Sequence, residues 1–338
     1  MEHSGALMPA DSAKFIANIA KYVEIHDAGL EKLCQEMLLS MKEGKLEIPD
    51  TGASISYLSK DDPKAVDWIF VADALNFCFW SYSEAEKWSV EGHSGYYALE
   101  AALSRAVEDG IDITNPEYYS KITESQLRNI MRSDNNTQIP LFDQRISVLH
   151  EVGSVLIRKY NGTFTTCIAE ANKSAGKLLE IIVNNFPCFR DEAVFNDTKV
   201  SLYKRAQILV ADLWNFFRGR GCGEFKDIDK ITMFADYRVP QVLVYFGVLS
   251  YTDEFMDKLK NDVLLPNGSP EEVEIRGCSI HAVELLKERI EKKIRESNMT
   301  NAEVPNSSLI DYYLWCYRRK YADEMENIPF HKTLSIYY

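Results

Sequence analysis

Asp236 is an ionisable residue in an otherwise apolar and aromatic run, Met233 to Leu249. Arg238 and Pro240 follow it almost at once. Burying a carboxylate costs several kcal/mol unless the group is paired or used. The run therefore predicts either a carboxylate that acts on a substrate or a structural one that caps a helix or pairs with Arg238.

Two further aromatic segments carry polar groups in the same way. Asp73 and Asn76 lie among the rings of residues 68–80. On a helix, Asp73, Asn76 and Trp80 would share one face, because residues three, four and seven positions apart are neighbours there. Asp311 likewise lies beside Tyr312 and Trp315.

This combination of side chains suits a flat heterocycle. Aromatic rings stack on its π-face, and carboxylates accept hydrogen bonds from its N–H edge. A guanine-type edge offers N1–H and a 2-amino group, which one carboxylate can accept together. We therefore expect a pocket for a purine-like base, with helix caps or Asp–Arg pairs as the alternative.

Lysine and arginine residues near these segments have two interpretations. Lys204 opens an amphipathic segment and could be catalytic, could bind phosphate, or could simply be solvated. The run Arg318-Arg319-Lys320 is by default a solvated surface, although Asp311, Trp315 and Arg318 would share one helical face.

Composition excludes several classes of function. The net charge is −13 and no long basic run is present, so we expect no stable nucleic-acid partner. The seven cysteines form no CxxC pair and the six histidines no HxxxH pair, so we expect neither a metal site nor a cofactor. No signal peptide and no apolar stretch of about 18–20 residues is found, which favours the cytoplasm or the nucleus and no membrane partner.

Most of the chain has helical periodicity. Strand signals are few and short, around 55–58 and 272–277. The fold class is therefore mainly α, in a single domain over residues 1–338 that is either one globule or two helical lobes with a central cleft. Helices are expected over residues 11–26, 30–41, 95–110, 139–162, 174–186, 200–219, 281–297 and 307–321.

Four blocks of this sequence closely resemble the queuosine salvage protein family, in the family's order and over nearly the whole chain. They are DALNFCFW (73–80), FADYRVPQVL (234–243), IDYYLWCYRR (310–319) and PFHKTLSIYY (329–338). The resemblance implies a queuosine 5′-phosphate N-glycosylase/hydrolase, which frees the base queuine for reuse in tRNA. It also implies a helical fold related to that of the base-excision DNA glycosylases.

The implied chemistry agrees with the residues. Cleaving an N-glycosidic bond builds positive charge on the ribose. By resemblance, Asp236 supplies the carboxylate that stabilises this charge and orients or deprotonates a water. Queuine is a 7-deazapurine, so the ring atom protonated when an ordinary purine departs is missing, and the sequence identifies no acid that replaces it.

The resemblance also implies which residues line the base pocket: Asp73, Asn76, Phe234, Tyr237, Asp311, Tyr312 and Trp315. The resemblance does not assign the phosphate contacts. Lys204 and Arg238 are cationic and could meet the 5′-phosphate, with Lys204 also a catalytic candidate beside Asp236.

Two rival functions stay open at this level. One is a glycosylase or nucleosidase for another modified nucleotide. The other is a non-catalytic helical module that binds nucleotides. The sequence does not determine the oligomeric state.

Overall fold

Helices dominate the part of the chain that the computed structural model describes, residues 5–44, 59, 61–82, 85–297 and 303–338. The strands in this part are two to four residues long and form small antiparallel pairs. The prediction of a mainly α fold with few short strands is therefore confirmed. The likeness to base-excision DNA glycosylases stays a prediction.

The chain divides into two compact units. Unit 1 contains residues 1–49, 191–204 and 229–334, and unit 2 contains residues 50–190, 205–228 and 335–338. The single-domain prediction, with or without two lobes around a cleft, stays a prediction.

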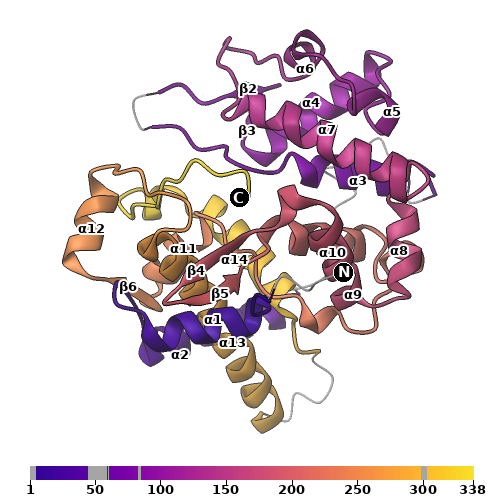
Figure 1. Cartoon of the computed structure of the whole chain (residues 1–338). Helices are drawn as coiled ribbons and strands as arrows, with labels where there is room; N and C mark the ends of the chain where they lie inside the picture. The colour runs from indigo at the N-terminus through magenta and orange to yellow at the C-terminus, as the bar shows by residue number, and fades with distance from the viewer. Residues whose placement is uncertain (1–4, 45–58, 60, 83–84, 298–302) are drawn as a thin grey trace. The chain divides into compact units, whose positions relative to one another are not determined.

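Helix α13 (Pro270–Glu296) is the central element of unit 1, and α1, α2, α11 and α14 pack against it (Figure 1). Its contact with α1 is close because Gly277 has no side chain: a Cβ atom there would lie 2.6 Å from Ile16 Cδ1. The other helices of this unit are α1 (Pro9–Ile19), α2 (Asp27–Lys42), α11 (Val239–Tyr245), α12 (Asp253–Lys260) and α14 (Ser307–Lys320).

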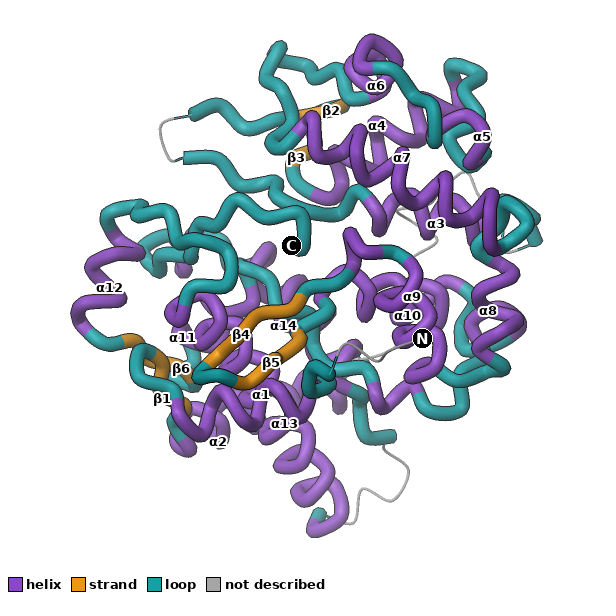
Figure 2. The backbone as a smooth tube through the Cα atoms, in the orientation of Figure 1, coloured by secondary structure: helices purple, strands orange, loops and turns teal. Residues whose placement is uncertain are grey.

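Two antiparallel pairs of strands complete unit 1 (Figure 2). Strand β1 (Val23–Ile25) pairs with β6 (Leu249–Tyr251), and β4 (Glu192–Phe195) pairs with β5 (Thr198–Ser201). The helix predicted over residues 11–26 is therefore too long. It ends at Ile19, and Val23 pairs with Tyr251 instead of continuing an apolar helical stripe.

The strand predicted over residues 272–277 is wrong, because these residues lie inside α13. Val273 and Ile275 alternate with charged residues, which is typical of a strand with one exposed face. Here both sets are buried: Glu272 and Arg276 are each 1% exposed. The helix also starts eleven residues before the predicted one, with Pro270 in its first turn. The strand predicted over residues 55–58 lies outside the described residues.

Unit 2 is built around α7 (Phe142–Lys159), against which α3, α5 and α6 pack. Gly153 allows the approach of α5, since a Cβ atom there would lie 2.8 Å from the Tyr119 ring. The other elements are α3 (Ala65–Ala74), α4 (Tyr96–Glu108), α5 (Pro116–Tyr119), α6 (Glu124–Ile130), α8 (Thr165–Ala171), α9 (Ala175–Asn185), most of α10 (Lys204–Phe216), and the pair β2 (Ser89–Val90) with β3 (His93–Ser94).

Local signals placed several helix ends correctly. The Asn306 side chain accepts a hydrogen bond from the Leu309 N–H (3.0 Å) and so caps α14. Gly110 follows α4 with a φ of +80°, a left-handed conformation that favours glycine. Helix α10 begins at Lys204, the residue expected to open the amphipathic segment, but the helix predicted over residues 200–219 is too long: Val200 and Ser201 belong to β5, and α10 ends at Phe216.

Candidate active site

The Arg276 guanidinium on α13 is buried in unit 1 and bonds two carboxylates. It donates to Asp191 through two nitrogens, at 2.6 and 3.0 Å, and to Glu272 Oε1 at 3.0 Å. All three side chains are at most 4% exposed. Buried charges of this kind are stable only when each is paired and hydrogen-bonded, so the three residues fix one another's positions.

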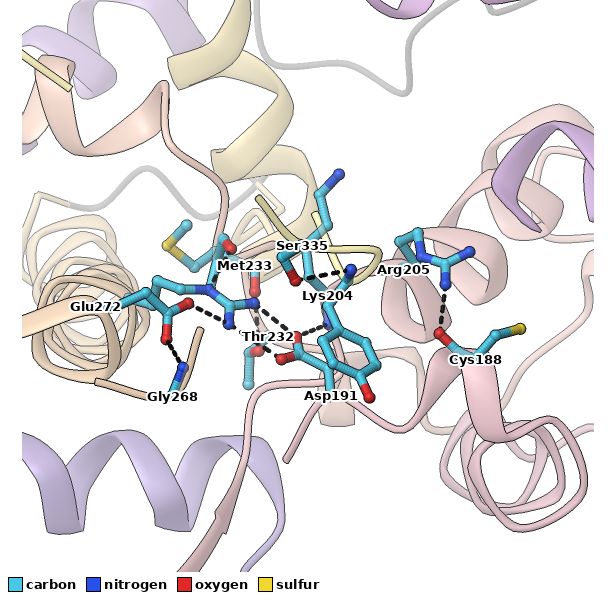
Figure 3. Close-up of polar contacts among 12 residues, drawn as sticks. Cys188, Asp191, Lys204, Arg205, Thr232, Met233, Gly268, Glu272 and Ser335 are labelled. Carbon is cyan, nitrogen blue, oxygen red and sulfur yellow. Dashed lines mark hydrogen bonds and ion pairs between the residues drawn. The ribbon is translucent and has the colours of Figure 1, made fainter. Parts of the chain in front are cut away.

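The carboxylates of this cluster also bind backbone N–H groups of the segments around them (Figure 3). Asp191 Oδ2 accepts from the N–H of Lys204, the first residue of α10, at 3.1 Å. Glu272 Oε2 accepts from the N–H of Gly268 at 3.0 Å. The cluster therefore fixes the start of α10, and with it the buried Lys204, which is 7% exposed.

The backbone on the N-terminal side of Asp236 is held from two helices. Arg276 Nε on α13 donates to the Ala235 carbonyl at 3.0 Å. Asp311 Oδ1 on α14 accepts from the Phe234 N–H, also at 3.0 Å. Residues 231–236 form no helix or strand of their own, so these side chains supply the partners that a regular element would provide.

The two oxygens of the Asp236 carboxylate have different roles. Oδ1 accepts from the backbone N–H groups of Arg238 (2.9 Å) and Val239 (2.8 Å) at the start of α11. Oδ2 forms no hydrogen bond or ion pair with a described residue, and the side chain is half-buried. The capping alternative is thus correct for one oxygen, while the other stays available for a substrate.

Burial raises the pKa of Asp236, and the Lys204 ammonium is the first influence that opposes this rise. The hydrogen bonds from Val239 and Arg238 and the charge of Arg238 also lower the pKa. The structure therefore brings Lys204 and Arg238 within electrostatic reach of Asp236. A carboxylate in such a partly dry environment exerts a stronger field than it would in water.

Arg238 does not form an ion pair with Asp236. Its guanidinium lies 4.2 Å from the centre of the Phe330 ring and 5.3 Å from that of Tyr237. The Tyr237 and Phe330 rings are 5.4 Å apart. Cation–π stacking of this kind holds the guanidinium beside the two rings.

Helix α14 turns one polar face toward the segment that carries Asp236. Asp311 contacts Phe234, and seven residues later Arg318 Nε donates to Gln241 Oε1 at 2.9 Å. Next to this face, the rings of Tyr312 and Trp315 are stacked with centres 6.3 Å apart. Tyr312 is exposed and Trp315 half-buried, so their rings are accessible in part.

Asp73 and Asn76 belong to unit 2. Helix α3 ends at Ala74. The prediction that Asn76 and Trp80 share a helical face with Asp73 is therefore wrong. Asn76 Nδ2 nevertheless donates a hydrogen bond to Asp73 Oδ1 at 3.4 Å. Both residues are buried.

Two buried arginines that the sequence analysis did not single out hold the turn after α3. Arg205 donates to the carbonyls of Asp73 and Ala74, at 3.3 and 2.5 Å, and to that of Cys188 (Figure 3). Arg145 donates to the Leu75 and Phe77 carbonyls, both at 2.5 Å. Carbonyls left unpaired where a buried helix ends thereby gain charged donors.

An acidic environment surrounds Tyr96 in the same unit. Burial and then the charges of Glu100, Asp212 and Asp73 raise the pKa of the Tyr96 hydroxyl. The Asp73 carboxylate is thus one of three acidic groups near this phenol.

The comparison with known families decides the membership of this chain. The model of the queuosine salvage protein family matches residues 56–338. This chain belongs to that family.

Relatives of this family member cover between 80% and 99% of its length. A Bos taurus protein named queuosine 5′-phosphate N-glycosylase/hydrolase is 45% identical, over 99% of each chain. A Mus musculus protein of the same name is 41% identical over 98% of this chain and 99% of its own. A Sphaerobacter thermophilus protein of that name is 38% identical over 80% and 81%.

A cavity in unit 1 lies apart from the predicted site residues. It has a volume of about 590 Å³ and is lined by residues of α1, β1, β6 and α13, among them Tyr22, Tyr251 and His281. None of the predicted site residues lines it.

Two further properties concern the described residues of this family member. Their helices include none that is long and apolar enough to cross a membrane. Their His, Cys, Asp and Glu side chains form no group of three that could hold a metal ion.

The Asp191–Arg276–Glu272 cluster was missed by the sequence analysis. The signal was present, because Glu272 and Arg276 are four residues apart, the spacing of an ion pair on a helix. The strand predicted over residues 272–277 would not bring Glu272 and Arg276 together, so this pair was not predicted. Asp191 is distant in sequence and carried no local signal.

Replacing Arg276 with methionine should destabilise this protein by about 3–5 kcal/mol, because Asp191 and Glu272 would remain buried without their partner. Unfolding in urea measures the free energy. Arg289→Met is the matched control on the same helix: Arg289 pairs with the exposed Asp27 and with Glu31, so its loss should cost at most about 1 kcal/mol. Equal losses for the two variants would contradict the central role of Arg276.

Proposed function

We propose that this chain hydrolyses the N-glycosidic bond of queuosine 5′-phosphate and releases queuine and ribose 5-phosphate. Family membership supports the reaction, together with relatives that carry the name of this activity. The observation that carries the proposal is the Asp236 carboxylate, which is anchored through one oxygen and open at the other. The queuine released would serve salvage into tRNA.

Asp236 is the catalytic residue of this proposal. As the bond to the base breaks, positive charge develops on the ribose, and Oδ2 would stabilise it. The same oxygen would orient the attacking water and accept its proton. Because Oδ1 is fixed by two backbone N–H groups, the carboxylate needs no reorganisation as the charge develops.

Lys204 and Arg238 would support this carboxylate. Both lower its pKa against the effect of burial, which keeps it ionised and able to act. The same positive charges would also attract the anionic substrate.

The base would bind through stacking and hydrogen bonds. The stacked pair of Tyr312 and Trp315, with Phe234 and Tyr237, offers aromatic faces for the 7-deazapurine ring. Asp311 uses Oδ1 for the Phe234 N–H, so it positions the site in addition to any contact with the base. Asp73 and Asn76 of unit 2 stay predicted base-binding residues.

The proposal also covers the compartment in which the protein acts and the molecules that it binds. We propose that the protein acts in the cytoplasm or the nucleus on a small nucleotide. With a net charge of −13, it would form no stable complex with nucleic acid.

The direct test is to incubate the purified protein with queuosine 5′-phosphate in buffer that contains EDTA, and to separate the products by chromatography. We expect free queuine and ribose 5-phosphate in equal amounts. Release that stops in EDTA and returns with a divalent ion would contradict metal-independent hydrolysis. Binding without release would favour the non-catalytic module, and release from other modified nucleotides alone would favour the rival glycosylase.

Asp236→Asn should lower kcat by about 10²–10³, the effect of deleting one electrostatic stabiliser. It should not lower stability at neutral pH. Its amide oxygen can still cap α11, and a raised pKa in the folded state means that this group stabilises least once pH exceeds that pKa. Asp236→Ala should lower kcat similarly and also cost about 1 kcal/mol through the lost cap. A purely structural residue would give the opposite result: an Asn variant that melts earlier but turns over normally.

In the pH profile of kcat/KM, the midpoint of the decrease at acid pH should lie above the ordinary aspartate pKa of about 3.9, because burial raises the pKa of Asp236. This decrease is called the acid limb. Lys204 opposes that rise, so Lys204→Met should move the limb to higher pH. Rate measurements from acid to neutral pH test this shift. If Lys204 acts only on the phosphate, the limb will stay in place while KM increases.

A further inference from the structure

Two arginines in unit 1 share one amide oxygen as acceptor. Gln241 Oε1 on α11 accepts from Arg238 Nη1 at 3.2 Å and from Arg318 Nε at 2.9 Å. A guanidinium only donates hydrogen bonds, so the atom between the two arginines must be the oxygen of the amide. Gln241 Nε2 in turn donates to the Ile328 carbonyl at 2.5 Å, which fixes the orientation of the amide.

The pair carries two positive charges with no carboxylate partner among the described residues. Neither guanidinium forms an ion pair with a described Asp or Glu, and their other nitrogens are not buried away from solvent. Burial and then the charge of Arg238 lower the pKa of Arg318, so the two cations repel each other. Placing like charges together is unfavourable unless an anion joins them.

The arrangement is already rigid. Arg238 is stacked near the Phe330 and Tyr237 rings, at 4.2 and 5.3 Å. Arg318 is half-buried on α14, in contrast to the exposed Arg319 and Lys320 that follow it. The default interpretation of these three residues as a solvated surface is therefore wrong for Arg318.

The position relative to Asp236 indicates which anion fits. Arg238 is two residues from Asp236 and its charge acts on that carboxylate. The guanidinium N–H groups that do not contact Gln241 can bind the oxygens of a phosphate in the bidentate manner typical of arginine. Because the charge of Arg238 reaches Asp236, a phosphate bound by Arg238 would lie within electrostatic reach of that carboxylate.

We propose that Arg238 and Arg318, bridged by Gln241, form the site that binds the 5′-phosphate dianion of the substrate. Arg318 and Gln241 are thereby specificity-determining residues. This inference rests on the proposed function, which supplies the identity of the phosphate.

The experiment compares kcat/KM for queuosine 5′-phosphate with that for queuosine, the nucleoside without the phosphate. The wild type should prefer the nucleotide by about tenfold or more, the value of a charge-assisted contact. Arg318→Gln should remove most of this preference by lowering kcat/KM for the nucleotide alone. Lys320→Gln removes one positive charge from the same helix and should leave the preference unchanged.

Gln241→Glu tests the same site without removing an arginine. Its carboxylate would pair with both guanidiniums and so occupy the site internally. Because glutamate loses the donor to the Ile328 carbonyl, unfolding in urea is measured on the same preparation to check that the fold persists. Nucleotide preference should fall, and calorimetry should show inorganic phosphate binding about tenfold more weakly than to the wild type.

The possible outcomes separate the two proposals. If the wild type cleaves neither compound, the proposed function fails, and phosphate binding still reports on the arginine pair. If the wild type cleaves both but Arg318→Gln and Gln241→Glu keep the preference, or lose both activities equally, the arginine pair does not bind the phosphate.

Discussion

Burying the Arg276 guanidinium imposes a constraint on much of unit 1. A buried charge is tolerated only if its donors are matched, and the matching groups come from segments far apart in sequence: Asp191, Glu272 and the carbonyl of Ala235. Two of these three partners lie beside candidate site residues. Asp191 holds the N–H of Lys204, and Ala235 precedes Asp236. One ion cluster thus fixes two candidate catalytic side chains together.

Under the proposed function, the Asp236 carboxylate combines a structural and a chemical role in one group. Oδ1 satisfies backbone N–H groups that the start of α11 would otherwise leave unpaired, and Oδ2 is left for the substrate. Sharing the carboxylate in this way reduces the cost of burying it, since two of its hydrogen bonds are permanent. The field at Oδ2 is then available before the substrate arrives.

Local charge around this carboxylate differs in sign from that of the whole chain. The protein has a net charge of −13, yet the positive charges of Lys204 and Arg238 act on Asp236 in unit 1, and Arg318 shares the Gln241 oxygen with Arg238. Because salt screens charges beyond about 8–10 Å, an anionic substrate responds to the nearby cations more than to the distant acidic surface. Under the proposed function, this local positive charge would favour a small phosphate ester, while the acidic surface would repel a long polyanion.

The sequence alone determined the helical class, helix starts such as Lys204 and Asn306, and the unusual position of Asp236, because periodicity, caps and an ionisable residue in an apolar run are local signals. The tertiary structure decided that residues 272–277 are helical and that Arg276 bonds Asp191. A short run with alternating charge fits a strand or a buried helix equally well, and the choice depends on what packs against it. A buried ion pair between distant segments has no sequence signal, because its stability comes from the surroundings that folding creates.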